Sequence, residues 1–230
     1  MVSGLKSIND LFGFNKTNEK EGPDIYFYVP EYQRNYAWED KQINDFFDDF
    51  KANYKGLNKK YYYGTILLQS IENEESKDKF DIVDGQQRLT TLIVFIKCVL
   101  DRIAKIKNRS DSFDDEALSG IVKQCIIYKG NYRLTLQQDD NDFFHTYILK
   151  DNPYSDNFRT PSQKRLYHLK ERFIDLLNNI SDDIAIACIE NIMSTNILVY
   201  IVYSRSEASL IFETTNDRGK PLTNIEKYNK

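Results

Sequence analysis

The sequence predicts an α+β fold in which a small mixed β-sheet carries packed helices and is interrupted by a mostly helical insertion. Two patterns support this class. Apolar, β-prone runs occur over residues 24–29, 62–71, 80–83 and 196–203. From about residue 108 to residue 194, apolar residues recur mainly at helical spacing. A chain of 230 residues with 41% hydrophobic content also has enough apolar side chains to build a core.

The first expected elements are a strand and a helix. Residues 24–29 close on Pro30, which lacks a backbone donor and suits the end of a strand. Apolar residues then recur at helical spacing from Trp38 to Tyr54. Gly56 stands where a C-cap glycine would end the helix, so we expect an amphipathic helix after the strand.

A hairpin and a buried helix follow. Residues 62–71 and 80–83 are predicted to pair as two strands around a solvated acidic loop at 72–78. The polar turn at 84–88 then leads into residues 89–100, which are apolar on most faces. A helix with that pattern is largely interior.

The middle of the chain contains two well-signalled helix starts. Thr160 is a predicted N-cap, Pro161 suits the first helical position, and Gln163 completes a capping box that opens a helix to about Leu177. Ser181, followed by acidic residues, is predicted to begin another helix.

The end of the chain returns to the sheet. Residues 196–203 form the last predicted strand, residues 207–214 are short and helix-like, and Asn216 to Gly219 form a turn sequence. Thr223 and Glu226 form a second possible capping box, but few residues follow. We therefore expect the chain to continue into a further module.

These elements predict three segments. Residues 1–107 form an α+β core, residues 108–194 form the mostly helical insertion, and residues 195–230 supply the return strand and the turn that complete the core.

Composition excludes several classes of protein. The net charge of −4 lacks the basic footprint of a dedicated duplex-binding module, so any DNA contact needs a local patch. The cysteines and histidines show neither metal-ligand spacing nor a disulfide framework, which indicates a reducing compartment. These residues are Cys98, Cys125, Cys188, His145 and His168. No window has the length and hydropathy of a signal peptide or a membrane span, so we expect a cytoplasmic protein without membrane contact.

The turn Asp84-Gly85-Gln86-Gln87-Arg88 is the most informative stretch. Between a buried strand and a buried helix, it puts backbone N–H groups, the positive end of a helix dipole and Arg88 at one place, where phosphate could bind. Asp84 could then hold a metal ion or orient water. In the competing interpretation Asp84 caps the helix, Gly85 makes the turn and Arg88 pairs with a structural carboxylate. The residues alone leave both readings open.

Two further segments carry arginine among polar residues. In residues 29–38, Gln33 and Arg34 lie among aromatics that could stack on a base or simply pack in the core, and we favour a functional role for Arg34. In the last turn, Asn216 and Gly219 have the turn chemistry to hold Arg218 at a fixed angle, although an ordinary solvated turn is the simpler interpretation. We expect the three arginine-bearing segments to converge on one pocket.

Familiar nucleotide motifs and the nucleophile elbow are missing. The sequence contains no Gly-x-x-x-x-Gly-Lys-[Ser/Thr], no Gly-x-Gly-x-x-Gly and no Gly-x-Ser-x-Gly.

Four segments together resemble the N-terminal domain family of GmrSD-type restriction systems, a ParB/sulfiredoxin-like family. These segments are 30–38, 63–67, 82–92 and 212–219 with Leu222. The resemblance implies a domain that binds and hydrolyses a nucleoside triphosphate with Mg²⁺ and regulates an HNH-type nuclease module, in cis or in trans. It also implies phage defence against DNA that can carry modified bases, and a possible homo-oligomer.

The resemblance also implies site residues by matching position. Those expected to act in catalysis are Asp84, Gln86, Gln87 and Arg88. Those expected to bind the nucleotide are Gln33, Arg34, Gly85, Thr90, Thr91, Asn216 and Arg218.

Two other functions stay open at this stage. The same pocket could receive a modified base or a backbone phosphate in a non-enzymatic DNA-sensing module. In a third interpretation the domain is an antitoxin-like or assembly scaffold with a vestigial pocket.

Overall fold

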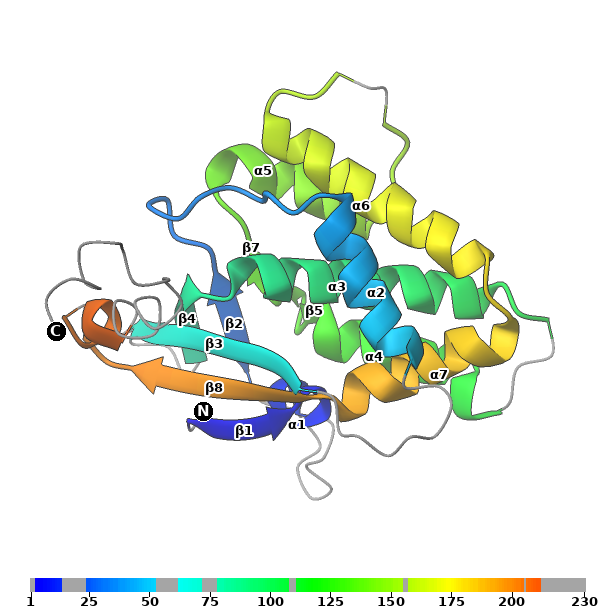
Figure 1. Ribbon diagram of the computed structural model, residues 1–230, viewed down its shortest axis with the longest axis horizontal. Coiled ribbons are helices and arrows are strands. Elements are labelled where there is room, and N and C mark those ends of the chain that lie inside the picture. The colour runs from blue at the N-terminus through cyan, green and yellow to red at the C-terminus, as the bar shows by residue number, and fades with distance from the viewer. Residues whose placement is uncertain are drawn as a thin grey trace, which may run out of the picture.

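A six-stranded mixed sheet is the frame of the molecule (Figure 1). The computed structural model describes residues 3–13, 24–52, 62–71, 78–107, 111–154, 157–204 and 206–211. The strand order is β1-β8-β3-β4-β2-β7, and β5 and β6 pair separately. The strands are β1 (Gly4–Ser7), β2 (Ile25–Tyr28), β3 (Tyr62–Ile71), β4 (Asp78–Asp84), β5 (Ile127–Tyr128), β6 (Asn131–Tyr132), β7 (Leu134–Thr135) and β8 (Asn196–Val202).

The strand pairing makes the sheet mixed. β3 and β4 pair antiparallel, which confirms the predicted hairpin, and β1 pairs antiparallel with β8. β8 runs parallel to β3, and β2 runs parallel to both β4 and β7. The α+β class with a mixed sheet and packed helices is therefore confirmed.

The predicted long helices form, with small shifts at their ends. Gly85 is the N-cap of α3, so this helix begins before the apolar run from Leu89. Thr160 and Ser181 cap α6 and α7 as expected. The helices are α1 (Ile8–Phe12), α2 (Asp40–Ala52), α3 (Gln86–Ala104), α4 (Asp115–Cys125), α5 (Gln138–Phe143), α6 (Pro161–Asn178) and α7 (Asp182–Ser194), with a 3₁₀ turn η2 (Asp111–Phe113) and a π-helix η3 (Phe144–Leu149).

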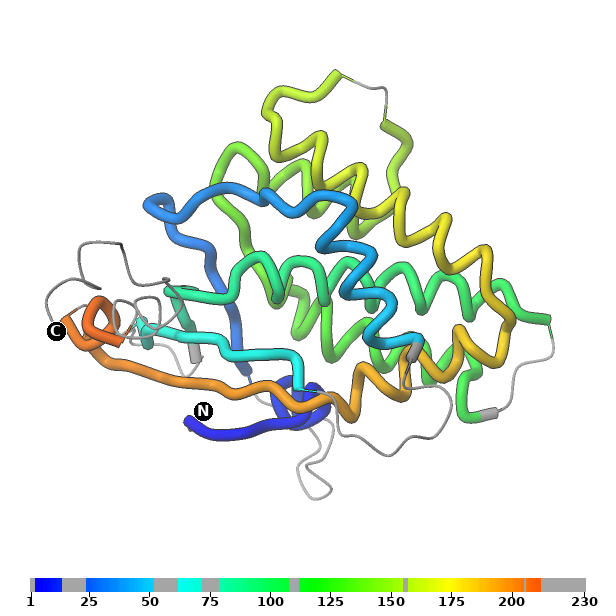
Figure 2. The backbone as a smooth tube through the Cα atoms, in the orientation of Figure 1, coloured from blue at the N-terminus to red at the C-terminus, as the bar shows by residue number. Residues whose placement is uncertain are grey.

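The helices α2, α3, α4, α6 and α7 gather on one side of the sheet (Figure 1). Figure 2 shows α3 running through the middle of this layer, while α2 crosses it. The Phe95 ring of α3 contacts Phe46 of α2 and Phe173 of α6, with centroids 5.1 and 4.8 Å apart. These aromatic contacts hold the helical layer together at the centre of the core.

The helical segment 108–194 shares its core with the sheet. Leu134 of β7, Leu169 of α6 and Ile189 of α7 belong to the same buried cluster as Ile66 and Ile82 of the sheet. The three-segment division stays a prediction about how the chain is organised.

The opposite face of the sheet carries a smaller apolar cluster. Leu67, Val83 and Val202 pack there against Ala208, which lies in the helical residues 206–211. Within the described part of the chain, no helix combines the length and hydropathy needed to cross a membrane. The predicted features at Gly56, at 72–77 and after 211 lie outside the described residues.

Candidate site at the start of helix α3

The junction between β4 and α3 is built on a left-handed glycine. Gly85 has φ 95°, a conformation that favours glycine, and a Cβ there would lie 2.6 Å from Cγ2 of Ile66. Gly85 is also the N-cap of α3, where no side chain of the described residues caps the first-turn N–H groups. These donors, together with the positive end of the helix dipole, favour an anion.

Gln86 and Gln87 fasten the connection between β2 and α2 to the start of α3. The Gln86 amide donates to the Arg34 carbonyl at 2.7 Å. The Gln87 amide donates to the Asn35 carbonyl at 3.2 Å, and its oxygen accepts the Ala37 N–H at 2.7 Å. Because both glutamines are buried, these bonds satisfy polar groups that water does not reach.

The same connection is held from two other sides. Gln33 donates from its side chain to the Val83 carbonyl of β4 at 2.8 Å. Gln137 is buried and donates to the Pro30 carbonyl at 3.1 Å and to the Gln33 carbonyl. The segment that contains Gln33 and Arg34 therefore lies against the end of β4, next to residues 84–88.

Thr90 and Thr91 are buried on the inner side of α3. The hydroxyls of Thr91 and Tyr36 are hydrogen-bonded at 2.8 Å. Burial raises the pKa of Tyr36 above its ordinary value, against the opposing effect of the Thr91 hydrogen bond. Tyr36 is thus a neutral packing residue, and the two threonines face the core.

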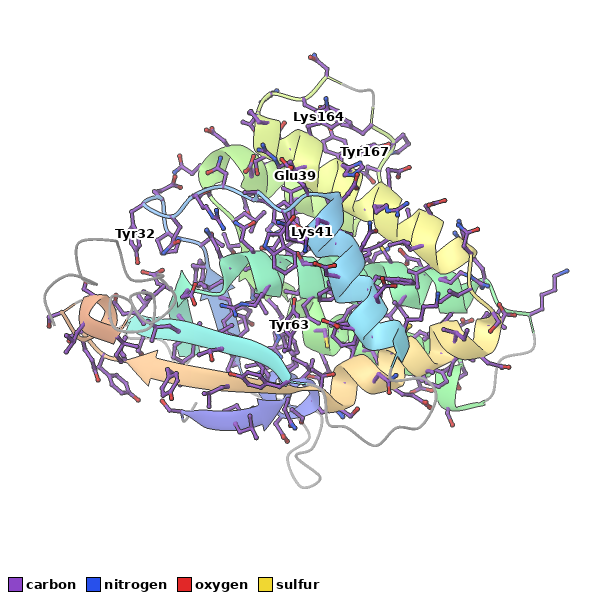
Figure 3. The ribbon with its side chains drawn as sticks, in the orientation of Figure 1. Tyr32, Glu39, Lys41, Tyr63, Lys164 and Tyr167 are labelled. Atoms are coloured by element: carbon purple, nitrogen blue, oxygen red, sulfur yellow. The ribbon has the colours of Figure 1, made fainter. Side chains whose placement is uncertain are left out.

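Arg88 lies in a cradle made by β3 and Asp84. Its guanidinium is 3.1 Å from the Asp84 carboxylate, and the two side chains are 29% and 45% exposed. A Cβ on Gly64 would lie 2.7 Å from Nη1 of Arg88, so only glycine permits this approach. The Tyr63 hydroxyl donates to the Arg88 carbonyl at 2.7 Å, and Figure 3 labels Tyr63 on β3.

Two side chains on the connection after β2 are exposed. Tyr32, which Figure 3 labels on the connection after β2, is 60% exposed, and Arg34 is exposed as well. Asn216 and Arg218 lie outside the described residues. The structure thus brings Gln33 and the Arg34 backbone to the 84–88 turn.

The geometry answers part of the question that the sequence left open. Asp84 does not cap the helix, because Gly85 occupies the N-cap, and Asp84 instead pairs with Arg88. That ion pair is partly solvated, so a phosphate could compete for the guanidinium.

Sequence reasoning missed two supports of the site. Gly64 was part of a motif, but its contact with Arg88 requires the β3 backbone to pass beneath α3. Gln137 lies in no motif, and only the fold brings it to Pro30.

A magnesium ion fits this turn only with help from a ligand. The described residues contain no cluster of three or more His, Cys, Asp or Glu side chains that could hold a metal. Mg²⁺ commonly takes one or two carboxylates plus phosphate oxygens and water. Asp84 could therefore serve as a carboxylate ligand beside a bound phosphate.

Residues 8–230 match the model of the family described as the GmrSD restriction endonuclease, N-terminal domain. The chain belongs to this family. The match spans both parts of the site, the connection after β2 and the β4–α3 turn. No curated protein matches the chain. Membership makes this GmrSD N-terminal domain a module of the restriction and defence class.

Proposed function

We propose that this domain binds and hydrolyses a nucleoside triphosphate at the β4–α3 turn, and that this reaction regulates an HNH-type nuclease module in a modification-dependent, anti-phage restriction system. One observation supports it above the others. Gly85 gives the first turn of α3 no side-chain cap, and the partly exposed Asp84–Arg88 pair lies beside it, so the helix dipole, N–H donors and a guanidinium could act on the same anion.

The groups at this turn have different roles in that reaction. The N–H groups of the first turn of α3 hold phosphate oxygens, and Arg88 neutralises charge that develops on the transferred phosphoryl group. Asp84 orients the attacking water and would hold Mg²⁺, which neutralises phosphate charge when it is bound. Arg34 approaches from the connection after β2.

Gln86 and Gln87 act differently from the catalytic role expected from motif position. Their amides are engaged by the backbone of residues 34–37. They are positioning residues, which keep Gln33 and Arg34 next to the turn. Thr91 has the same role through Tyr36.

The direct test replaces Arg88 by alanine. We expect phosphate release from NTP to fall by about 10³-fold, the lower end of what a charge-stabilising arginine contributes. The fold should persist because Arg88 is partly exposed. Arg165→Ala is the matched control, since Arg165 lies on α6 and its guanidinium is 3.8 Å from the surface carboxylate of Glu39. Undiminished turnover in Arg88→Ala would refute the assignment.

A second candidate is DNA sensing at the same turn. Tyr32 is 60% exposed near Arg34, and such a pair can stack on a base and hold its phosphate. Calorimetry with nucleotide and with short modified and unmodified duplexes separates the two functions. DNA binding should weaken steeply with salt, as counterion release requires. Duplex binding that is lost in Arg88→Ala, without any NTP turnover, would favour sensing.

A further inference from the structure

A second cavity lies away from the β4–α3 turn, in the helical part of the molecule. It has a volume of about 690 Å³ and is bounded by α5, the π-helix η3, the start of α6 and residues of the loop before it. Sites for small organic ligands commonly have volumes of about 300–1,000 Å³. A π-helix is rare, and such segments occur frequently at functional sites.

Partly buried hydrogen bonds hold the walls of this cavity. Gln163 donates to the Asp139 carbonyl at 2.8 Å and accepts the Arg159 N–H at 2.9 Å. The Thr160 hydroxyl donates to the buried Asp140 carboxylate at 2.8 Å. The cavity is therefore preorganised, which lowers the cost of ordering it around a ligand.

Ion pairs of Asp151 hold the start of the loop between η3 and α6. Asp151 pairs with Lys97 of α3 and with Lys170 of α6, and both lysine side chains are largely buried. Lys170 also donates to the Tyr147 carbonyl of the π-helix at 2.7 Å. These contacts tie the loop and the π-helix to the core.

Aromatic rings form one side of the cavity. Tyr154 packs against Phe143 and Tyr147, with ring centroids 4.9 and 4.6 Å apart. Tyr167 of α6, labelled in Figure 3, also contacts the Tyr154 ring, with centroids 5.9 Å apart. Tyrosine faces of this kind can stack on the π-face of a base.

Three of the side chains that line the cavity carry a charge. Asp139, Asp142 and Arg159 are exposed, and none forms an ion pair with another described residue. Asp and Glu accept hydrogen bonds from the exocyclic amine of cytosine, and arginine binds phosphate. The lining carries one more negative than positive charge, which suits a neutral ring bearing an amine better than a free polyphosphate.

We propose that this cavity binds an unpaired nucleotide whose base carries an exocyclic amine, cytosine or adenine. The base stacks on the tyrosine side, its amine donates to Asp139 or Asp142, and its single phosphate meets Arg159. The site is separate from the triphosphate site and does not depend on it. The nucleotide can be free or part of a single DNA strand, because both present the same groups.

The test uses nucleoside pairs in which a carbonyl replaces the exocyclic amine and the adjacent ring nitrogen becomes an N–H donor. Calorimetry should show that the chain binds cytidine at least about tenfold more tightly than uridine, and adenosine more tightly than inosine, because a carbonyl in place of the amine leaves a carboxylate facing an acceptor. The double variant Asp139→Asn, Asp142→Asn should abolish this preference. Glu190→Gln, on an exposed position of α7, is the control and should keep it.

Further binding measurements test the contact between Arg159 and the phosphate and identify the source of the nucleotide. Cytidine monophosphate should bind more tightly than cytidine, and Arg159→Gln should remove that gain. If an oligo-dC strand binds more tightly than cytidine monophosphate, DNA is the source of the nucleotide. If cytidine monophosphate binds more tightly than the strand, the ligand is the free nucleotide. Arg88→Ala should change none of these results, so failure here is distinct from failure of the triphosphate site.

The proposal is overturned if cytidine and uridine bind with equal affinity and adenosine and inosine also bind with equal affinity. It is also overturned if none of these nucleosides binds, or if the double variant binds nucleosides as the unmodified chain does.

Discussion

At the scale of single residues, the contact between Gly64 and Arg88 has the sharpest consequence. Gly64 has φ 102°, and a methyl group there would collide with the Arg88 guanidinium. We predict that Gly64→Ala displaces Arg88 and lowers NTP turnover at least about tenfold, because transition-state charge is stabilised only in correct geometry. Steady-state phosphate release measures the effect.

Gly130→Ala is the matched control for that substitution. Gly130 also has a positive φ, 80°, but a Cβ there has nothing within 4 Å. Both variants should lose about 1–3 kcal/mol of stability from backbone strain. Equal turnover in the two variants would show that Gly64 acts through the fold alone.

His145 gives a prediction about pH. Burial lowers the pKa of His145, against the opposing effects of its hydrogen bond to the Leu134 carbonyl and of Asp142. Its folded-state pKa therefore lies below the unfolded value of about 6.5. Its contribution to stability is complete above that value and is lost as the pH falls through the folded-state pKa.

An NMR titration of the imidazole protons should place the pKa of His145 below about 6.5. Urea unfolding should show a smaller loss of stability between neutral pH and mildly acidic pH in His145→Gln than in the unmodified chain. Titration of His145 at or above the ordinary value would contradict the burial that the structure gives it.

At the scale of elements, Gln87 joins α3 to the connection between β2 and α2. Gln87→Ala leaves the Asn35 carbonyl and the Ala37 N–H without their partner. We predict a loss of about 1–3 kcal/mol in the free energy of unfolding, because two hydrogen bonds are lost and each contributes about 0.5–1.5 kcal/mol. Hydrogen exchange at Ala37 should also become faster than in the unmodified chain.

Gln138→Ala is the comparison, because Gln138 is an exposed residue at the start of α5. It should change stability by no more than about 0.5 kcal/mol. A loss equal to that of Gln87→Ala would show that the connection is not fastened by the glutamine.

The elements whose apolar side chains form a clear pattern along the sequence were predictable. The run 62–71 lies between the lysines at 59 and 60 and the acidic residues from Glu72, and it coincides with β3. β1 was missed because Gly4–Ser7 is too short to show a pattern, and its strand exists only by pairing with β8. The predicted capping box of α6 forms in half, because Gln163 accepts the Arg159 N–H instead of the Thr160 N–H.

The candidate site could also be predicted only in part from the sequence. Residues 84–88 could be predicted because a polar turn interrupts two apolar runs. The burial of Gln86 and Gln87 could not, since their partners are backbone groups about fifty positions earlier in the chain. The cavity beside the π-helix was not predicted either, because its lining comes from three elements without a shared motif.

At the scale of the whole molecule, the shared core predicts one unfolding transition. Phe173 of α6 is fully buried and contacts Phe46 and Phe95. Phe173→Ala should therefore cost about 3–5 kcal/mol. The loss should appear equally in far-UV circular dichroism and in the fluorescence of Trp38, the sole tryptophan of the chain, which packs against the same core.

Two separate transitions would contradict that expectation. If Trp38 fluorescence kept its unmodified midpoint while the circular dichroism shifted, the segment 108–194 would unfold as a unit of its own.

The most direct measurement of the central claim is a ¹H–¹⁵N NMR titration of the chain with non-hydrolysable nucleoside triphosphates. We expect saturable shifts of the Gly85, Gln86, Gln87 and Arg88 amides that vanish in Arg88→Ala. Saturable shifts that leave these four amides unmoved, or no binding by any triphosphate, would contradict it.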